Sequence, residues 1–187
     1  MQVTALDIAG LFVFEPRVFS DERGAFFESF NATRFREATG LEVEFVQDNH
    51  SISKQGVVRG LHYQLAPHAQ GKLVRVVTGR VWDVAVDIRP GSPSFGKWAG
   101  VELSADNRKQ FWIPAGFAHG FVALEDDTQF LYKTTALWHG ASERAIRWDD
   151  AALAIDWPMP GKAIVSGKDA VAPLFADAEL PKPGDHR

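Results

Sequence analysis

Short apolar runs separated by polar turns dominate the chain. The runs are rich in Val, Phe, Ile and Trp, and Gly, Pro, Asn and Asp lie between them, which is typical of β-strands joined by turns. In "KLVRVVTGRVWDVAVDI" two alternating runs flank Thr78 and Gly79, so we predict a hairpin there. The expected strands cover residues 11–15, 43–47, 51–53, 57–63, 72–78, 80–88, 97–103, 110–113, 118–124 and 128–135.

Helices are predicted to be few and short. "NATRFREATG" has Asn31 as an N-cap candidate and Gly40 as its end, and a second short helix is expected after Asp169. The chain shows no repeat and no linker, so we predict one domain over residues 1–187, with 181–187 as a flexible tail. A single domain with this many strands avoids exposed sheet edges as a sandwich or as a jelly-roll barrel, and the pattern alone does not separate the two.

Composition narrows the classes of function. A net charge of −4 argues against a nucleic-acid-binding protein, because such proteins carry clustered basic surfaces. The chain has no Cys, which excludes disulfides, thiolate catalysis and Cys-ligated metal centres and fits a reducing compartment. The first apolar run is interrupted by Asp7 and Glu15 and has no basic region before it, so neither a signal peptide nor a membrane span is expected. We therefore expect a cytoplasmic protein.

The histidines are the first candidates for chemistry. "PAGFAHGF", residues 114–121, resembles the second motif of the cupin jelly rolls, Pro-x-Gly-x-x-His, and contains His119. The first cupin motif of the metal-binding members needs His-x-His and then Glu, but here His62 is followed by Tyr63 and Gln64, and Lys72 would repel a cation. We therefore predict a mainly β, cupin-type jelly-roll barrel without a metal site, in which His68 is a solvent-exposed bystander.

Seven further segments carry a more specific resemblance. They are "FVQDNHSIS" (45–53), "GVVRGLHYQ" (56–64), "GKLVRVVTG" (71–79), "PAGFAHGF", "FLYKTT" (130–135), "ERAIRWDD" (143–150) and "SGKD" (166–169) with the Pro and Leu that follow it. Together they resemble the dTDP-4-dehydrorhamnose 3,5-epimerase family from about "RVFSDERGAFFE" to Leu174. The resemblance implies a dTDP-linked 4-keto-6-deoxyhexose as substrate, dTDP-4-dehydro-6-deoxy-D-glucose, which is converted to the L-rhamnose precursor dTDP-4-dehydro-L-rhamnose.

The implied reaction inverts the two carbons beside a ketone, C3 and C5. It needs a base, a group that stabilises the enolate oxygen and an acid on the opposite face, and it needs no redox cofactor and no metal. The resemblance assigns His62 as base, Asp169 as the carboxylate that orients it, Tyr132 as proton donor and Lys72 as the cation at the enolate oxygen. His119 is expected to donate a further hydrogen bond to the ligand.

Binding of the nucleotide and sugar is implied for a second set of residues. Trp138 lies where the family has a Tyr that stacks on the thymine ring, a departure that leaves the base preference open. The likeness also implies a homodimer in which N-terminal strands extend the neighbour's sheet. The positions that match the family's substrate contacts are Arg23, Glu28, Gln47, Asn49, Arg59, Glu143 and Lys168.

Other interpretations are open at this point. Taken alone, His62 reads as a core histidine, Tyr132 as a barrel aromatic and Lys72 as a solvated charge. An epimerase that inverts only one carbon would show the same motifs. Two alternatives from other classes are a metal-dependent cupin oxygenase and a non-catalytic sugar-nucleotide binder.

Overall fold

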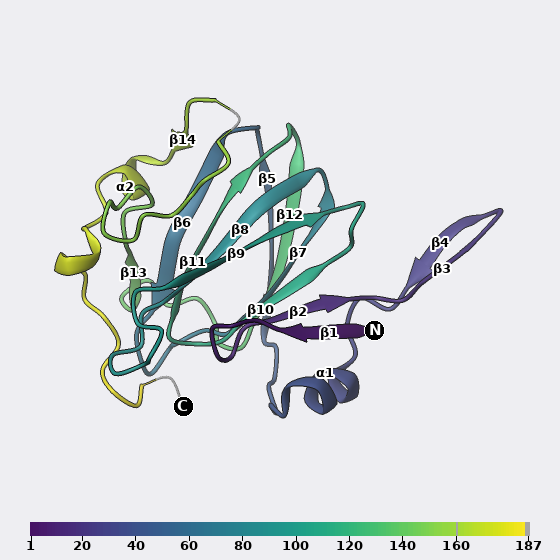
Figure 1. The fold of residues 1–187 in the computed structure, drawn as a ribbon, viewed down its shortest axis with the longest axis horizontal. Helices are drawn as coiled ribbons and strands as arrows, with labels where there is room; N and C mark the ends of the chain where they lie inside the picture. The colour runs from purple at the N-terminus through teal and green to yellow at the C-terminus, as the bar shows by residue number, and fades with distance from the viewer. Residues whose placement is uncertain (160, 186–187) are drawn as a thin grey trace.

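Two antiparallel sheets packed face to face form the body of the molecule in the computed structural model, which describes residues 1–159 and 161–185 (Figure 1). The first sheet has the order β1 (Gln2–Ala5), β2 (Phe12–Glu15), β10 (Gln110–Ile113), β7 (Lys72–Thr78), β12 (Thr128–Thr134) and β5 (Gln47–Ser53). The second has the order β13 (Glu143–Ala145), β6 (Val57–Gln64), β11 (Phe117–Ala123), β8 (Arg80–Asp87) and β9 (Trp98–Ser104), and β14 (Ile164–Val165) pairs in parallel with β6. The prediction of a mainly β protein of the jelly-roll type is confirmed.

Apolar side chains fill the space between the two sheets. Val74 and Phe130 come from the first sheet, Leu103 and Phe121 from the second, and all are buried in one cluster. Because side chains alternate along a strand, each of these strands can also present residues to its other face. The core closes one part of the sandwich, and the candidate site occupies another.

The predicted first helix is α1 (Ala32–Thr39). The Asn31 side chain accepts a hydrogen bond from Arg34 N, and Gly40 takes a left-handed conformation with φ 73°, as the sequence predicts. Phe35 is the buried residue of the helix, and its ring lies 5.0 Å from that of Trp112 and 5.4 Å from that of Phe14. The helix thereby covers the end of the first sheet near β1 and β2 (Figure 1).

Several predicted boundaries are wrong. Residues 43–47 are not a strand; 41–46 are irregular because Val43 and Phe45 pack beside α1, and Gln47–Ser53 is one strand. The second helix, α2 (Gly167–Ala170), contains Asp169 rather than following it, because Ser166 caps it. Elements that the sequence did not predict are β1, β3 (Val18–Asp21), β4 (Gly24–Phe27), β13, β14 and the 3₁₀ helix η1 (Phe175–Asp177).

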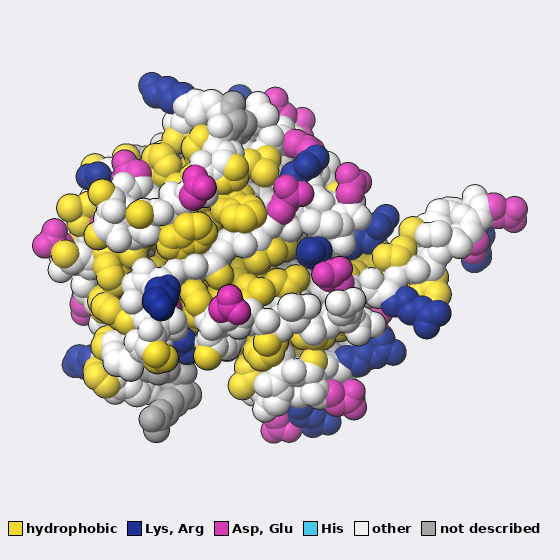
Figure 2. Space-filling view, viewed as in Figure 1, with side chains coloured by type: hydrophobic (Ala, Val, Ile, Leu, Met, Phe, Trp, Pro, Cys, Tyr) yellow, Lys and Arg dark blue, Asp and Glu magenta, His cyan; other side chains and the backbone are white. Residues whose placement is uncertain are grey.

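The β3–β4 hairpin projects away from the sandwich. It pairs with neither large sheet and extends into solvent, as Figures 1 and 2 show. Phe19 and Phe26 are 53% and 72% exposed on it. Exposed aromatic side chains on a projecting ribbon are typical of a surface that contacts another molecule.

The C-terminal segment reaches the body of the protein. Pro181 is buried, and Lys182 N donates to Asp185 Oδ2 at 2.8 Å. His186 and Arg187, the end of the expected tail, lie outside the described residues, so the tail and the single-domain assignment stay predictions. Within the described residues, the helices are too short or too polar to cross a bilayer.

A close approach of two strands makes glycine necessary at position 60. Gly60 has φ +139°, and a Cβ there would lie 2.5 Å from Gly120 Cα and 2.9 Å from His119 O. We expect Gly60→Ala to lower the free energy of unfolding by more than ~2 kcal/mol, because both the backbone conformation and the neighbouring strand oppose a side chain. Urea unfolding measures this. Gly167→Ala is the control, since nothing lies within 4 Å of the added methyl group, and an equal loss in the two variants would contradict the packing argument.

Candidate active site

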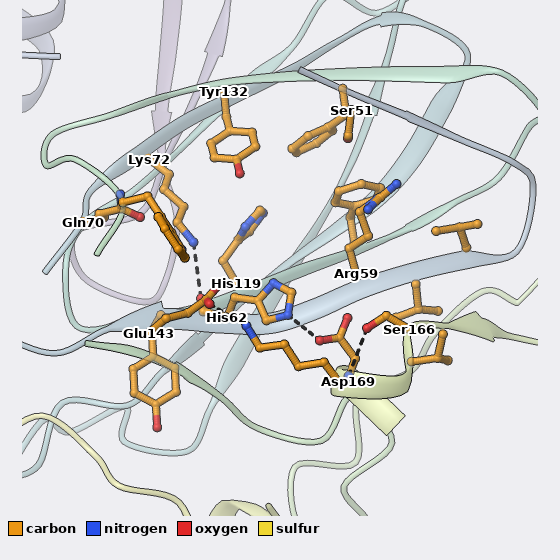
Figure 3. Close-up of a pocket in the computed structure, with 18 of the residues that line it drawn as sticks. Ser51, Arg59, His62, Gln70, Lys72, His119, Tyr132, Glu143, Ser166 and Asp169 are labelled. Carbon is orange, nitrogen blue, oxygen red and sulfur yellow. Dashed lines mark hydrogen bonds and ion pairs between the residues drawn. The ribbon is translucent and has the colours of Figure 1, made fainter. Parts of the chain in front are cut away.

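A cavity of about 480 Å³ opens between the two sheets (Figure 3). Strands β6 and β11 form one wall, and β7 and β12 form the other. Pockets of this size bind small molecules. The cavity brings together nine of the residues that the sequence predicted: Arg59, His62, Lys72, His119, Tyr132, Trp138, Glu143, Lys168 and Asp169.

His62 and Asp169 form a close polar pair in the cavity. His62 Nε2 lies 2.6 Å from Asp169 Oδ1, and 107 residues separate the two along the chain. Burial raises the pKa of the Asp169 carboxyl, but hydrogen bonds from His62, Gly60 N and Ser166 outweigh it, so that pKa lies below its usual range. The ionised carboxylate holds one ring nitrogen of His62 and leaves the other available to a ligand.

Tyr132 belongs to the opposite wall. It lies on β12, whereas His62 lies on β6 in the other sheet, and Figure 3 shows its hydroxyl pointing into the cavity toward His62 and His119. Burial, and secondarily the negative charge of Glu143, raise the pKa of the Tyr132 phenol. The phenol therefore stays protonated at neutral pH and can act as an acid.

Lys72 is a buried cation beside these groups. It is 8% exposed, and its Nζ donates to the backbone oxygen of His62 at 3.3 Å. Burial lowers the pKa of Lys72 to about 8, while the carboxylates of Asp83 and Glu143 oppose that shift. The ammonium group is thus charged at pH 7 but close to titrating.

A second buried His–Asp pair lies behind the first. His119 Nε2 is 2.9 Å from Asp83 Oδ2, and both residues are buried. Burial lowers the pKa of the His119 imidazole and raises the pKa of the Asp83 carboxyl. The attraction between the two groups opposes both shifts but does not reverse either of them. His119 is adjacent to His62 in the register of β11 and β6, so Asp83 acts on the cavity through His119.

Charged residues line the mouth of the cavity. Lys168 Nζ forms an ion pair with Glu143 Oε2 at 2.5 Å, and Arg59 Nε donates to Ser53 Oγ at 3.1 Å. Both cations are accessible, and arginine and lysine are the side chains that bind phosphate oxygens.

Four predicted binding residues do not line this cavity. Arg23 lies on the projecting hairpin, where it pairs with Asp21 at 2.5 Å, and Glu28 pairs with Arg34 at 3.1 Å. Gln47 and Asn49 are joined by a 2.9 Å hydrogen bond, and Asn49 lines a neighbouring cavity of about 240 Å³. The sequence motifs therefore include four residues that the fold of a single chain does not bring to the cavity of His62.

Some lining residues were not predicted. Ser51 lies two residues after Asn49 on β5 and so on the same face, and its hydroxyl has no hydrogen-bond partner within the described part of the chain. Because side chains alternate between the two faces of a strand, the expected position of Asn49 also predicts that Ser51 lies on the cavity side. Asp83 was also detectable as a lone carboxylate inside the apolar run "VWDVAVD". Gln64, Gln70 and Ser166 carried no such signal.

Two earlier expectations concern metals and His68. Across residues 1–159 and 161–185, no three or more His, Cys, Asp or Glu side chains are grouped as a metal site.

The prediction that His68 is solvent-exposed is wrong, because it is half-buried and its ring stacks on that of His139 with centroids 3.9 Å apart.

Comparisons with known proteins identify the family of the chain. The family model described as dTDP-4-dehydrorhamnose 3,5-epimerase matches residues 5–177. The dTDP-4-dehydrorhamnose 3,5-epimerase of Pseudomonas aeruginosa is 57% identical over 96% of this chain and 98% of its own, and that of Escherichia coli is 55% identical over 90% and 91%.

A solved structure gives the same result for the fold. The crystal structure of the dTDP-6-deoxy-D-glucose-3,5-epimerase from Legionella pneumophila, in complex with dTDP-4-keto-L-rhamnose, is 50% identical and covers 97% of each chain with a TM-score of 0.93. A match of this extent includes the strands on both sides of the cavity. The chain belongs to the dTDP-4-dehydrorhamnose 3,5-epimerase family.

Proposed function

We propose that the protein converts dTDP-4-dehydro-6-deoxy-D-glucose to dTDP-4-dehydro-L-rhamnose by inverting C3 and C5, in dTDP-L-rhamnose biosynthesis in the cytoplasm. The observation that carries the proposal is the placement of a base and an acid on facing walls. His62 lies on β6 of one sheet, and Tyr132 lies on β12 of the other. Inversion at carbon requires the proton to leave one face and return to the other, and two facing sheets supply that arrangement.

His62 takes the proton from the carbon beside the ketone. The C–H bonding pair delocalises onto the ketone oxygen and forms an enolate, while the proton binds the ring nitrogen of His62 that Asp169 does not hold. The 2.6 Å contact with the carboxylate stabilises the resulting imidazolium and keeps the ring oriented.

Lys72 stabilises the enolate oxygen. Its ammonium group is buried in the cavity beside His62, where a charge acts more strongly than it does in water. His119 adds a hydrogen bond, and Asp83 fixes the orientation of its ring. Both groups are in place before the charge develops.

Tyr132 returns a proton to the opposite face of the carbon. Its O–H bond breaks as the new C–H bond forms and the ketone is restored, so no electron is gained or lost overall and no redox cofactor or metal is required. Proton exchange with solvent then restores both His62 and Tyr132. Repetition at the second carbon flanking the ketone gives the doubly inverted product, and a second exchange resets the two residues.

The nucleotide lies toward the mouth of the cavity in this proposal. Arg59 and Lys168 bind the diphosphate, and Glu143 orients Lys168 through their ion pair. Trp138, at the rim, stacks on the thymine ring, and an indole offers the larger face compared with the phenol usual in the family. Asn49 lines the neighbouring cavity of the first sheet, and Gln47 Nε2 donates to Asn49 Oδ1 at 2.9 Å.

A homodimer accounts for the residues that the cavity of one chain lacks. Arg23 and Glu28 match substrate contacts of the family, yet they lie on or just after the projecting hairpin. The exposed Phe19 and Phe26 on that hairpin suit burial against another copy. We propose that the hairpin of each copy carries Arg23 to the cavity of its neighbour.

The base assignment predicts isotope exchange. In D₂O the wild-type protein is expected to introduce deuterium at both carbons flanking the ketone. His62→Ala is expected to slow exchange by about 10²–10⁴-fold, because His119, the other imidazole on that wall, is buried and held by Asp83. NMR or mass spectrometry of the product measures the label. Exchange at the normal rate in His62→Ala would refute the assignment.

The same experiment separates the alternative functions. Deuterium at only one carbon would identify a single-carbon epimerase, and tight binding without any exchange would identify a sugar-nucleotide binder. Loss of exchange after dialysis against a chelator, with recovery on adding a transition metal, would favour the metal-dependent class.

The pKa of Lys72 predicts the alkaline limb of the pH profile. Below about pH 8 the ammonium group is charged and stabilises the enolate; as the pH rises above about 8 the charge is lost, so kcat/KM is expected to fall toward tenfold per pH unit. Tyr132 does not set this limb, because burial keeps its phenol protonated to higher pH. Stopped assays from pH 6 to pH 10 measure it.

Lys72→Arg is the matched variant for that limb. An arginine stays charged throughout this range, so its lower activity is expected to show no decline near pH 8. A decline at the same pH in the variant and the wild type would assign the titration to another group.

The proposed dimer predicts complementation between inactive chains. His62→Ala and Arg23→Ala are each expected to be weakly active, but a mixed dimer contains one cavity with an intact His62 and an intact Arg23 from the other copy. Co-refolding the two variants is therefore expected to restore activity well above that of either alone, measured by deuterium exchange. Additive activities in a mixture shown to contain heterodimers would contradict the shared site.

A further inference from the structure

The connection between β12 and β13 carries an aromatic side chain to the mouth of the cavity. Residues 136–139 form neither helix nor strand, and Leu137 and Trp138 are 63% and 61% exposed. Leu137 and Trp138 thus have little packing to fix their position, whereas His139 stacks on His68. The backbone hydrogen bonds of the segment therefore decide where the indole of Trp138 lies.

A single buried side chain makes two of these bonds. Gln64, at the end of β6, is 5% exposed; its Oε1 accepts from His139 N at 2.8 Å and its Nε2 donates to Leu137 O at 3.2 Å. The same Nε2 also donates to His68 O at 2.6 Å. The reverse orientation of the amide would set its oxygen against two carbonyls, so this arrangement is unique.

Two further glutamines complete the set. Gln47 Oε1 accepts from Trp138 N at 2.9 Å, and Gln70 Nε2 donates to Ala136 O at 2.7 Å. The three side chains come from β5, from β6 and from the residues before β7, and they reach four successive residues of one irregular segment. An amide suits this role because it both donates and accepts.

The indole is also fixed from one side. A Cβ on Gly140 would lie 3.0 Å from the Trp138 ring, so the ring rests against the backbone of the glycine. Its remaining exposure is available to a flat ligand at the rim of the cavity, where stacking is sensitive to small displacements.

We propose that Gln64, with Gln47 and Gln70, is a positioning residue for the nucleotide base: it holds the backbone of residues 136–139 so that Trp138 stands at the mouth of the cavity in the orientation that stacks on the base. The inference rests on the proposed function. It gives Gln47 a role in supporting Trp138 beside the ligand contact that the sequence predicts, and it adds Gln64, whose side chain bonds to backbone groups within the described part of the chain.

Gln64→Met tests the role, because methionine matches the length of glutamine but forms none of the three bonds. The Kd for dTDP and the KM for the sugar nucleotide are expected to rise about tenfold, the loss of roughly one or two hydrogen bonds, with kcat within twofold of the wild-type value. The Kd for inorganic pyrophosphate, which has no base, is expected to stay unchanged. Calorimetry and steady-state assays measure these values.

A double-mutant cycle shows whether Gln64 acts through Trp138. Trp138→Ala is expected to weaken dTDP binding to a similar extent, and the double variant is expected to bind no more weakly than Trp138→Ala. Gln55→Met is the control, because Gln55 also donates to a loop carbonyl, Leu124 O at 2.9 Å, and it is expected to leave dTDP binding unchanged. Gln70→Met removes the bond to Ala136 O at 2.7 Å in the same segment; it is expected to weaken dTDP binding in the same direction and covers the case in which Gln64→Met does not fold.

Four outcomes would overturn the inference or what it rests on. Wild-type dTDP affinity in the folded Gln64→Met or Gln70→Met variant, or a loss in Gln64→Met that adds fully to that of Trp138→Ala, would refute the positioning role alone. Equal weakening of dTDP and pyrophosphate would show a general distortion of the cavity and would also refute it. Failure of the wild-type protein to bind dTDP would refute the proposed function itself.

Discussion

The contact between the His62 imidazole and the Asp169 carboxylate is the interaction on which the rest of the site depends. It joins β6 to α2, and the parallel pairing of β14 with β6 places the segment before α2 alongside the strand that carries His62. A buried carboxylate without a partner would be costly, so the pair also fixes the C-terminal segment against the second sheet. The contact between His62 and Asp169 thus both stabilises the C-terminal segment and orients the base.

Burial gives the cavity its chemical character. The same loss of water lowers the pKa of Lys72 to about 8 and raises that of the Tyr132 phenol, which leaves a titratable cation and a protonated acid side by side on one sheet. The base stands on the other sheet. A sandwich can place these groups on opposite faces of a bound ring because each strand presents alternate residues to the interior, and the facing walls are rigid.

Long alternating runs allowed much of the fold to be predicted. Strands β6, β7, β8 and β12 and the caps of α1 agree with the sequence because their patterns and turn residues act locally. The misses are five strands of two to four residues and the segment 43–46, whose apolar residues pack on a helix instead of pairing in a sheet; the five strands are β1, β3, β4, β13 and β14. Short segments take their structure from their neighbours, and no pattern within them records that.

The identity of the chemical groups was determined by the sequence alone: an imidazole, a carboxylate, a phenol and an ammonium group in motifs that resemble one family. Only the tertiary structure decided which of them meet. It brings Asp169 to His62 and sets Tyr132 across from both, but it leaves Arg23 on a distant hairpin and turns Gln47 toward the backbone of Trp138. Residue chemistry is a property of each position, whereas proximity between positions far apart in the chain arises only when the sheets pack.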